Sequence, residues 1–123
     1  MLTEEDTARF AREFVKKLKG NEVVCLEGEL GAGKTTFVRY AVEALGPEKN
    51  EQVRSPSFTL VNLYRTAKGE VYHADFYRAE TELEEFVGKG LVFVEWPKGY
   101  ELCDYLIKFE VLPEGRRVRV FKR

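Results

Sequence analysis

Apolar residues recur at helical spacing near the start of the chain. They are Phe10, Ala11, Phe14, Val15 and Leu18. Thr3 suits an N-cap, because Asp6 follows three residues later as in a capping box. Gly20 is a typical stop signal. The pattern therefore predicts an amphipathic helix over Thr3–Lys19.

Two short apolar runs without alternation are typical of strands that are covered on both faces. These runs are Glu22–Glu27 and Leu91–Trp96. Between them, Lys34–Leu45 has the pattern of a helix that Gly46 and Pro47 close. We expect the polar stretch that follows it, residues 48–56, to be a surface loop.

Two pairs of β-branched and aromatic runs are each joined by a short turn containing glycine, which predicts two hairpins. The first joins residues 57–65 to 70–77, and the second joins 105–112 to 116–121. Thr81–Val87 is expected to be a short helix with Thr81 as its cap. Three helices and about six strands predict one α/β domain over residues 1–123.

Composition narrows the class of protein. The 123 residues are 44% hydrophobic and 33% charged, with a formal net charge of −1. Such a balance excludes a protein held to nucleic acid by bulk charge, although a local basic patch stays open. The longest apolar run is strand-sized, and the acidic N-terminus is unlike a signal peptide. The sequence predicts a soluble cytoplasmic protein without a membrane contact, and favours reduced thiols over a disulfide for Cys25 and Cys103.

A glycine-rich segment between a predicted strand and a predicted helix carries the clearest chemical signal. Residues 28–35, Gly-Glu-Leu-Gly-Ala-Gly-Lys-Thr, fit the Walker A or P-loop pattern at every fixed position. Glycines let the backbone aim successive N–H groups at phosphate, and the following helix adds its N-terminal dipole. Lys34 is expected to reach the β- and γ-phosphates, and the Thr35 hydroxyl to ligate Mg²⁺. The alternative is a glycine-rich turn beside a surface lysine.

Acidic residues at strand ends can complete such a site. Glu95 closes the run Leu91–Glu95 as in a Walker B strand, with Glu in place of the usual Asp. Asp75, in the segment His-Ala-Asp-Phe-Tyr-Arg at 73–78, lies at the end of another predicted strand and could also reach the metal. Both carboxylates could instead be solvated strand ends. His73 fits a structural role better than a catalytic one. A polar loop containing Arg54, Ser57 and Thr59 could contact the γ-phosphate or merely cap a strand.

Some features of hydrolytic P-loop enzymes are missing from the sequence. Trp96 stands where a water-orienting carboxylate often follows the Walker B acid, and no arginine is evident beside the phosphate loop. We therefore expect slow hydrolysis by the chain alone. Arg116, Arg117 and Arg119 alternate along a predicted hairpin and favour a solvated or nucleic-acid-facing strand over the lid of a small-molecule kinase.

Four segments together resemble the TsaE (YjeE) family of small bacterial P-loop ATPases. They are residues 28–39, the Ser-Pro-Ser-Phe-Thr segment at 55–59 with its continuation to 64, His-Ala-Asp-Phe-Tyr-Arg at 73–78, and Val-Glu-Trp-Pro at 94–97. Ser57 stands where the family commonly has threonine. The resemblance implies a P-loop NTPase-like α/β fold, a three-layer sandwich whose mixed sheet has a parallel core and antiparallel hairpins.

The resemblance also implies roles for individual residues. Lys34, Asp75 and Glu95 would be catalytic, and Thr35, Glu95 and Asp75 would hold Mg²⁺. The nucleotide would contact Glu29, Leu30, Gly31, Ala32, Gly33, Lys34, Thr35, Thr36, Ser57 and Trp96. The implied activity is a weak, Mg²⁺-dependent ATPase that supports a TsaB–TsaD complex in the threonylcarbamoyl modification of adenosine 37 of tRNA. A small-molecule kinase and a nucleotide-gated binding module are the alternatives, and direct contact with tRNA stays open.

Overall fold

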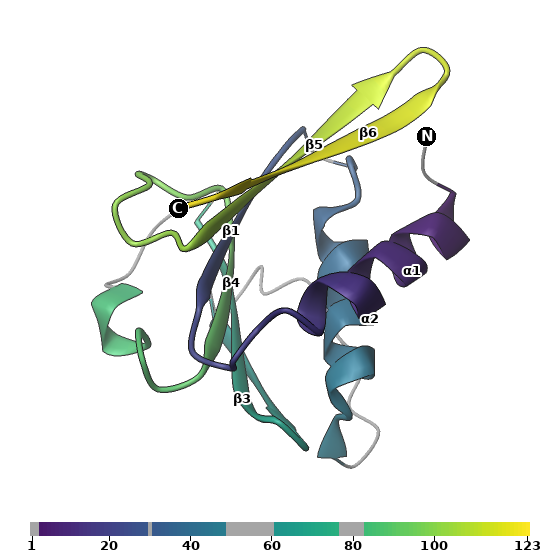
Figure 1. Ribbon diagram of the computed structural model, residues 1–123. Coiled ribbons are helices and arrows are strands. Elements are labelled where there is room, and N and C mark those ends of the chain that lie inside the picture. The colour runs from purple at the N-terminus through teal and green to yellow at the C-terminus, as the bar shows by residue number, and fades with distance from the viewer. Residues whose placement is uncertain (1–2, 30, 49–60, 77–82) are drawn as a thin grey trace.

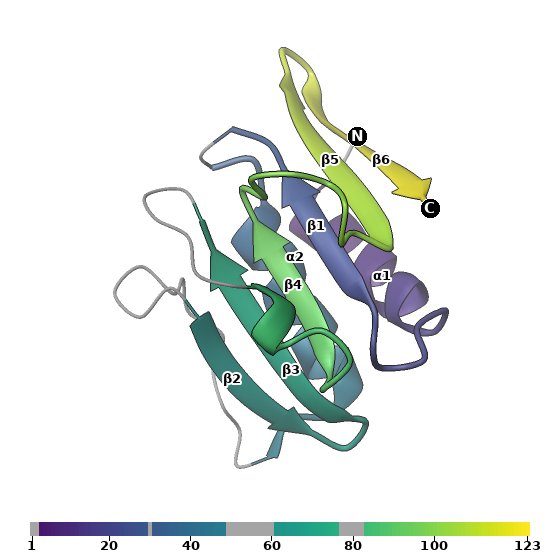
Figure 2. The same ribbon diagram turned by 90° about the vertical axis from the view of Figure 1, so that its left-hand side faces the viewer.

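A mixed six-stranded sheet organises the chain (Figures 1 and 2). The computed structural model describes residues 3–29, 31–48, 61–76 and 83–123. The elements in chain order are α1 (Glu4–Val15), β1 (Val23–Glu27), α2 (Lys34–Leu45), β2 (Val61–Thr66), β3 (Gly69–Asp75), the 3-10 helix η2 (Leu83–Glu85), β4 (Leu91–Glu95), β5 (Tyr105–Leu112) and β6 (Gly115–Lys122). The α/β class predicted from the sequence is confirmed.

Strand order brings the two predicted buried strands together at the centre of the sheet. The order is β2-β3-β4-β1-β5-β6, with β3, β4, β1 and β5 parallel and an antiparallel strand at each edge. Both predicted hairpins form, β2 with β3 and β5 with β6. Parallel strands present their carboxyl ends at one edge of the sheet, where ligands bind in open α/β folds. That edge carries Glu27, Asp75 and Glu95.

Both α-helices pack on the same face of the sheet (Figure 1). Phe37 of α2 lies at the centre of this core, with its ring centroid 5.4–5.9 Å from those of Phe10, Phe14, Phe93 and Phe109. These tilted and edge-on contacts add to the stability gained by burying the rings. The core therefore anchors α2, and with it the segment that precedes α2.

The N-terminal cap of α1 has the predicted chemistry. The Thr3 hydroxyl accepts from the backbone N–H of Asp6, and the Asp6 carboxylate accepts from that of Thr3. The helix ends at Val15, earlier than the predicted Lys19, because the N–H groups of Lys17 and Leu18 turn back to carbonyls three residues earlier. Thus the capping box predicted the beginning of the helix better than glycine predicted its end.

The opposite face of the sheet has a thinner cover. Its second apolar cluster includes Val23, Val92 and Val94, packed with Leu83 and Phe86 from the segment around η2. The helix predicted for Thr81–Val87 is a single 3-10 turn over Leu83–Glu85, while residues 81 and 82 lie outside the described residues. Among the described residues, the third layer thus consists of one short turn and a loop.

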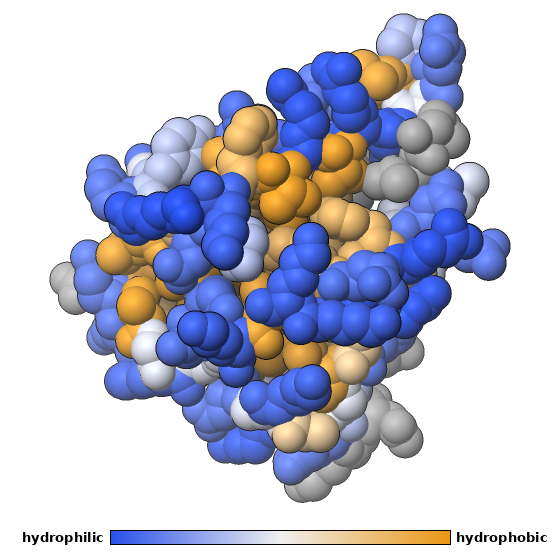
Figure 3. Space-filling view, viewed as in Figure 1, coloured by the Kyte–Doolittle hydropathy of each residue, from blue (hydrophilic) through white to orange (hydrophobic). Residues whose placement is uncertain are grey.

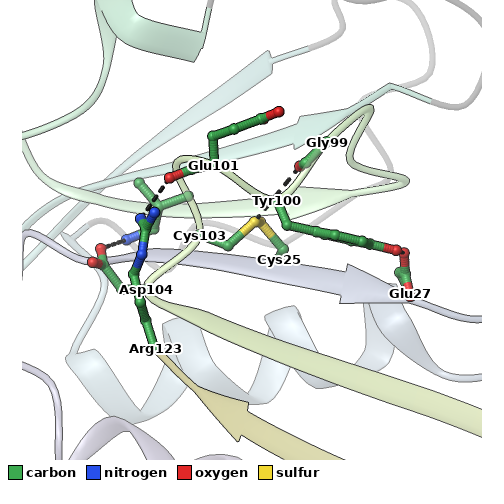
Figure 4. The surroundings of a disulfide bond; sticks show 9 residues. Cys25, Glu27, Gly99, Tyr100, Glu101, Cys103, Asp104 and Arg123 are labelled. Atoms are coloured by element: carbon green, nitrogen blue, oxygen red, sulfur yellow. Dashed lines mark hydrogen bonds between the residues drawn. A yellow bond between two sulfur atoms is a disulfide. The ribbon is translucent and has the colours of Figure 1, made fainter.

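A disulfide joins Cys25 of β1 to Cys103, so the prediction of two reduced thiols is wrong (Figure 4). The two Cα atoms are 5.8 Å apart although the residues are 78 positions apart in sequence. The parallel pairing of β1 with β5 explains this proximity, because Tyr105 is in register with Val24. Spacing in sequence held no sign of that pairing.

The β5–β6 hairpin extends beyond the two helices (Figure 1). Ile107 of β5 is buried on the side of the hairpin that faces the helices. Val120 pairs with Ile107 and Val111 follows it by four residues, so both valines lie on that same side, and both are exposed. Apolar side chains gather below the hairpin between hydrophilic surfaces (Figure 3). In the described part of the chain, no helix has the length and apolar character that crossing a membrane requires.

Candidate functional site

The phosphate loop connects β1 to α2 and has the backbone geometry that its glycines predict. Gly28, Gly31 and Gly33 have φ angles of 154°, 80° and 109°, which side chains with a Cβ resist. Gly28 is also sterically required, since a Cβ there would lie 2.5 Å from the carbonyl oxygen of Phe109 in β5. The glycine at this position therefore shapes the loop and allows β5 to pack against it.

The first turn of α2 faces the loop without a side-chain cap. Gly33 is the N-cap, and it has no side chain that could accept a hydrogen bond from the helix. The first N–H groups of any α-helix lack partners within the helix, so those of Lys34, Thr35 and Thr36 are available to an anion. The helix dipole favours negative charge at the same place. This arrangement has the backbone geometry that binding of a phosphate requires.

Lys34 supplies a buried cation inside the loop. The residue is 4% exposed, and its Nζ donates to the carbonyl oxygens of Gly28 at 2.5 Å and Glu29 at 3.0 Å. Nζ also lies 4.4 Å from the centroid of the Trp96 ring. Burial lowers the pKa of Lys34, and the negative charges of Glu95 and Asp75 oppose that shift. The ammonium group is thus held by weak carbonyl partners, which a phosphate oxygen could replace.

Glu95 connects three elements through one carboxylate oxygen. Its Oε2 accepts a 2.9 Å hydrogen bond from the Thr35 hydroxyl of α2 and lies 2.5 Å from His73 Nε2 of β3. Glu95 is 4% exposed and His73 is fully buried. Nδ1 of His73 has no hydrogen-bond partner among the described residues. His73 therefore lies behind Glu95 and holds it, which agrees with the structural role favoured from the sequence.

Asp75 lies beside Glu95 at the same edge of the sheet. The two residues are in register on the parallel strands β3 and β4. Directly after β4, Trp96 has a φ angle of 60°, the left-handed region that non-glycine residues rarely adopt. Its backbone N–H donates to the carbonyl of Leu26 in β1 at 3.1 Å. This turn holds Trp96 against β1, with its ring beside Lys34 Nζ.

These groups line one open cleft with a volume of about 210 Å³. The lining residues are Gly31, Gly33, Lys34, Thr35, Thr36, Asp75, Glu95, Trp96 and Arg116. All but one of them were predicted as site residues from the sequence. Two acidic oxygen donors and a hydroxyl face a lysine and a helix N-terminus, so the cleft has the charge pattern that a metal-bound polyphosphate requires.

Some predicted site residues have other positions. The side chain of Ala32 is buried in the core, and its N–H already donates to the carbonyl of Glu29 at 3.0 Å. The Glu29 side chain is exposed, and its backbone carbonyl contacts Lys34. Leu30 and Ser57 lie outside the described residues, as do Arg54 and Thr59. Their predicted contacts with nucleotide stay predictions.

Arg116 is the site residue that sequence reasoning missed. No arginine was evident beside the phosphate loop, yet Nη2 of Arg116 donates to the carbonyl oxygen of Gly31 at 3.3 Å. The expectation of a solvated strand does describe Arg117 and Arg119, which both pair with Glu110. Only the parallel pairing of β1 with β5 places the hairpin against the loop, and no local sequence pattern predicts that pairing.

Comparisons with known proteins identify a family for the chain. The sequence profile of the family described as "Threonylcarbamoyl adenosine biosynthesis protein TsaE" matches residues 1–119. A TsaE protein of Aquifex aeolicus is 46% identical, with 98% of this chain and 92% of that protein covered. A TsaE protein of Bacillus subtilis is 38% identical, covering 97% of this chain and 73% of the relative.

A solved structure shares the fold as well as the sequence pattern. The crystal structure of Bacillus subtilis YdiB superposes with a TM-score of 0.74 at 31% identity, over 98% of this chain and 80% of that one. The family match spans the phosphate loop, both acidic strand ends, β5 and the first part of β6. The chain therefore belongs to the TsaE family of threonylcarbamoyl adenosine biosynthesis proteins.

Proposed function

We propose that the chain is a Mg²⁺-dependent ATP-binding protein with slow ATPase activity, which supports a TsaB–TsaD complex in the threonylcarbamoyl modification of tRNA at position 37. The observation that carries the proposal is the position of Lys34. Its buried ammonium group lies within a glycine loop, beside two carboxylates and a helix N-terminus. Membership of the family gives the pathway, and the cytoplasm is the compartment that this role implies.

Nucleotide binding follows from the chemistry of the loop and Lys34. The ammonium group would exchange two backbone carbonyls for phosphate oxygens, which are stronger, charged acceptors. The N–H groups at the start of α2, which have no partner within the helix, would donate to the same phosphate chain. Trp96, already against Lys34, offers a ring face beside the site. Each of these contacts uses a group that the described structure places in one cleft.

The donor set also suits Mg²⁺. Thr35 Oγ1 and Glu95 Oε2 are hard oxygen donors 2.9 Å apart, and Asp75 is in register with Glu95 on the neighbouring strand. Thr35, Glu95 and Asp75 would hold the ion together with phosphate oxygens. The bound ion would neutralise negative charge on the phosphates. His73 behind Glu95 would keep the carboxylate in position, as outer-shell partners of metal ligands commonly do.

Slow turnover follows from what the cleft residues can do with water. Glu95 is engaged by Thr35 and His73, and the next residue is Trp96 rather than an acidic group. A nucleophilic water would therefore be poorly oriented, and orientation supplies much of the rate of phosphoryl transfer. The cleft is open to solvent, so a partner protein could complete it.

Two other functions make different predictions. A small-molecule kinase would transfer phosphate to a metabolite, and a nucleotide-gated binding module would bind ATP without turnover under any partner condition. The net charge of −1 favours a protein partner over bulk attraction to tRNA.

The test is phosphate release from MgATP by the chain alone and with purified TsaB and TsaD. We expect slow release alone, a clear rise with the pair, and loss of both in Lys34→Ala. The matched control is Lys89→Ala, which removes an exposed lysine outside the cleft. No rise with an active pair would contradict the stimulation, and modification of tRNA supported by Lys34→Ala would contradict the role of ATP.

A further inference from the structure

Arg116 lies at the tip of the β5–β6 hairpin, where its guanidinium reaches the phosphate loop. Nη2 donates to the carbonyl oxygen of Gly31 at 3.3 Å, and Nη1 lies 3.9 Å from where a Cβ on Gly33 would be. The side chain also lines the cleft that contains Lys34 and Glu95. Arg116 is exposed, so its long side chain can move by rotation without disturbing the core.

The neighbouring arginines of the same strand have different surroundings. Arg117 and Arg119 both form ion pairs with Glu110, at 3.1 Å and 2.9 Å. Within the described ranges, Arg116 has no carboxylate within ion-pair distance. Its hydrogen bond to Gly31 is to a neutral carbonyl, a weaker acceptor than an ionised oxygen. Hence Arg116 brings an uncompensated positive charge to the mouth of the cleft.

The two sides of the cleft differ in charge. Asp75 and Glu95 come from β3 and β4, on one side of β1, whereas the hairpin with Arg116 continues β5 on the other side. If the metal ion of a bound nucleotide lies at the two carboxylates, the rest of the phosphate chain would extend toward the β5–β6 hairpin. A guanidinium there matches phosphate geometry, since its N–H groups can donate to two oxygens at once.

We propose that Arg116 is a phosphate ligand of the bound nucleotide, supplied by the β5–β6 hairpin from the side opposite the carboxylates. On binding, its guanidinium exchanges the Gly31 carbonyl for phosphate oxygens. This inference rests on the proposed function, because it requires a nucleotide in the cleft. It differs from that proposal in assigning a cation outside the Walker A sequence to the site.

The test compares three substitutions by titration of ATP and of inorganic tripolyphosphate, with Mg²⁺ present. Arg116→Gln removes the charge and keeps an N–H donor for Gly31, while Arg116→Lys keeps the charge. Arg117→Gln is the matched control one residue away. We expect Arg116→Gln to weaken both ligands by about ten- to a hundredfold. Arg116→Lys should recover part of that loss, and Arg117→Gln should stay within about twofold of the original chain.

The outcomes separate the two proposals. If the unsubstituted chain binds neither probe, the proposed function fails and this inference fails with it. If that chain binds both and Arg116→Gln binds them equally well, the inference alone is wrong. Weakening of ATP without weakening of tripolyphosphate would place the contact on the nucleoside and overturn the inference. A lower melting temperature of nucleotide-free Arg116→Gln, with no recovery of affinity in Arg116→Lys, would assign Arg116 to loop support instead.

Discussion

Thr35 and Glu95 are joined by a 2.9 Å hydrogen bond although 60 positions separate them in the sequence. The bond links the first turn of α2 to the end of β4, and so fixes the phosphate loop relative to the acidic edge of the sheet. Both oxygens are predicted metal ligands. The fold therefore brings these two predicted ligands together before any ion binds, which reduces the conformational entropy that the side chains would lose on binding.

Glu95→Gln should separate charge from geometry at this position. The amide is nearly isosteric and can still contact Thr35 and His73, but it removes the negative charge near the proposed ion. We expect the gain in ATP affinity on adding Mg²⁺ to fall by about tenfold or more, since charge-assisted contacts are about twice as strong as neutral ones. ATP titrations with and without Mg²⁺ measure the change. Glu84→Gln, an exposed substitution in η2, is the control, and an unchanged response to Mg²⁺ in Glu95→Gln would remove Glu95 from the site.

Lys34→Met should weaken binding without lowering stability. Burial lowers the pKa of Lys34, so the folded chain holds the charged form at a cost. We expect ATP affinity to fall by about a hundredfold or more, with the melting temperature of the nucleotide-free protein equal or higher. Calorimetry and thermal melting of the same samples check both effects. A large loss of melting temperature would show that the contacts of Nζ with Gly28 and Glu29 outweigh the cost of burial.

The disulfide should make stability depend on redox conditions. Cross-linking residues 78 positions apart restricts the unfolded chain, and the loop-entropy relation puts this stabilisation at about 4.5 kcal/mol. Urea unfolding with and without reductant should show that difference in the unsubstituted chain and no difference in Cys103→Ala. Equal stability of the unsubstituted chain under both conditions would mean that the bond contributes nothing.

Glu22 should give stability a dependence on acidic pH. Burial raises the pKa of its carboxyl, but hydrogen bonds from the backbone N–H groups of Lys19, Gly20 and Asn21 outweigh burial and lower it below 4.5. A lowered pKa means that the stabilisation is present above pH 4.5 and is lost as pH falls through the folded value. Glu22→Gln should therefore cost about 1 kcal/mol at pH 7 and progressively less as the pH falls below 4.5.

The measurement is urea unfolding across that pH range. Glu43→Gln changes an exposed glutamate in α2 and serves as the control. A difference between Glu22→Gln and the unsubstituted chain that is the same at pH 7 and pH 3 would assign the effect to packing rather than to charge.

Local chemistry made part of the site predictable from the sequence. The bounds of α2 and the left-handed glycines follow from the Walker A pattern and its flanking stop signals. The acidic end of β4 followed from a short run of apolar residues that closes in a carboxylate. Asp75 was expected near the end of a strand predicted over residues 70–77, and β3 ends at Asp75 itself. Such signals lie within a few neighbouring residues, and therefore sequence alone can carry them.

Features that depend on strand order were not predictable in this way. The disulfide of Cys25 with Cys103 and the contact of Arg116 with Gly31 both require β5 to lie beside β1. That neighbour relation is set by packing of the whole sheet, which no short pattern records. The 3-10 turn at Leu83–Glu85 was missed for another reason: acidic residues after a threonine also fit a short α-helix.

The close approach of β5 to Gly28 limits how this chain can evolve. Any side chain at that position would meet the Phe109 carbonyl at 2.5 Å and would have to push β1 and β5 apart. A substitution there would damage the loop that faces the cleft and the pairing that holds β5 in the sheet in a single step. Position 28 is therefore restricted to glycine by two requirements at once, because a single substitution would affect both ligand binding and folding.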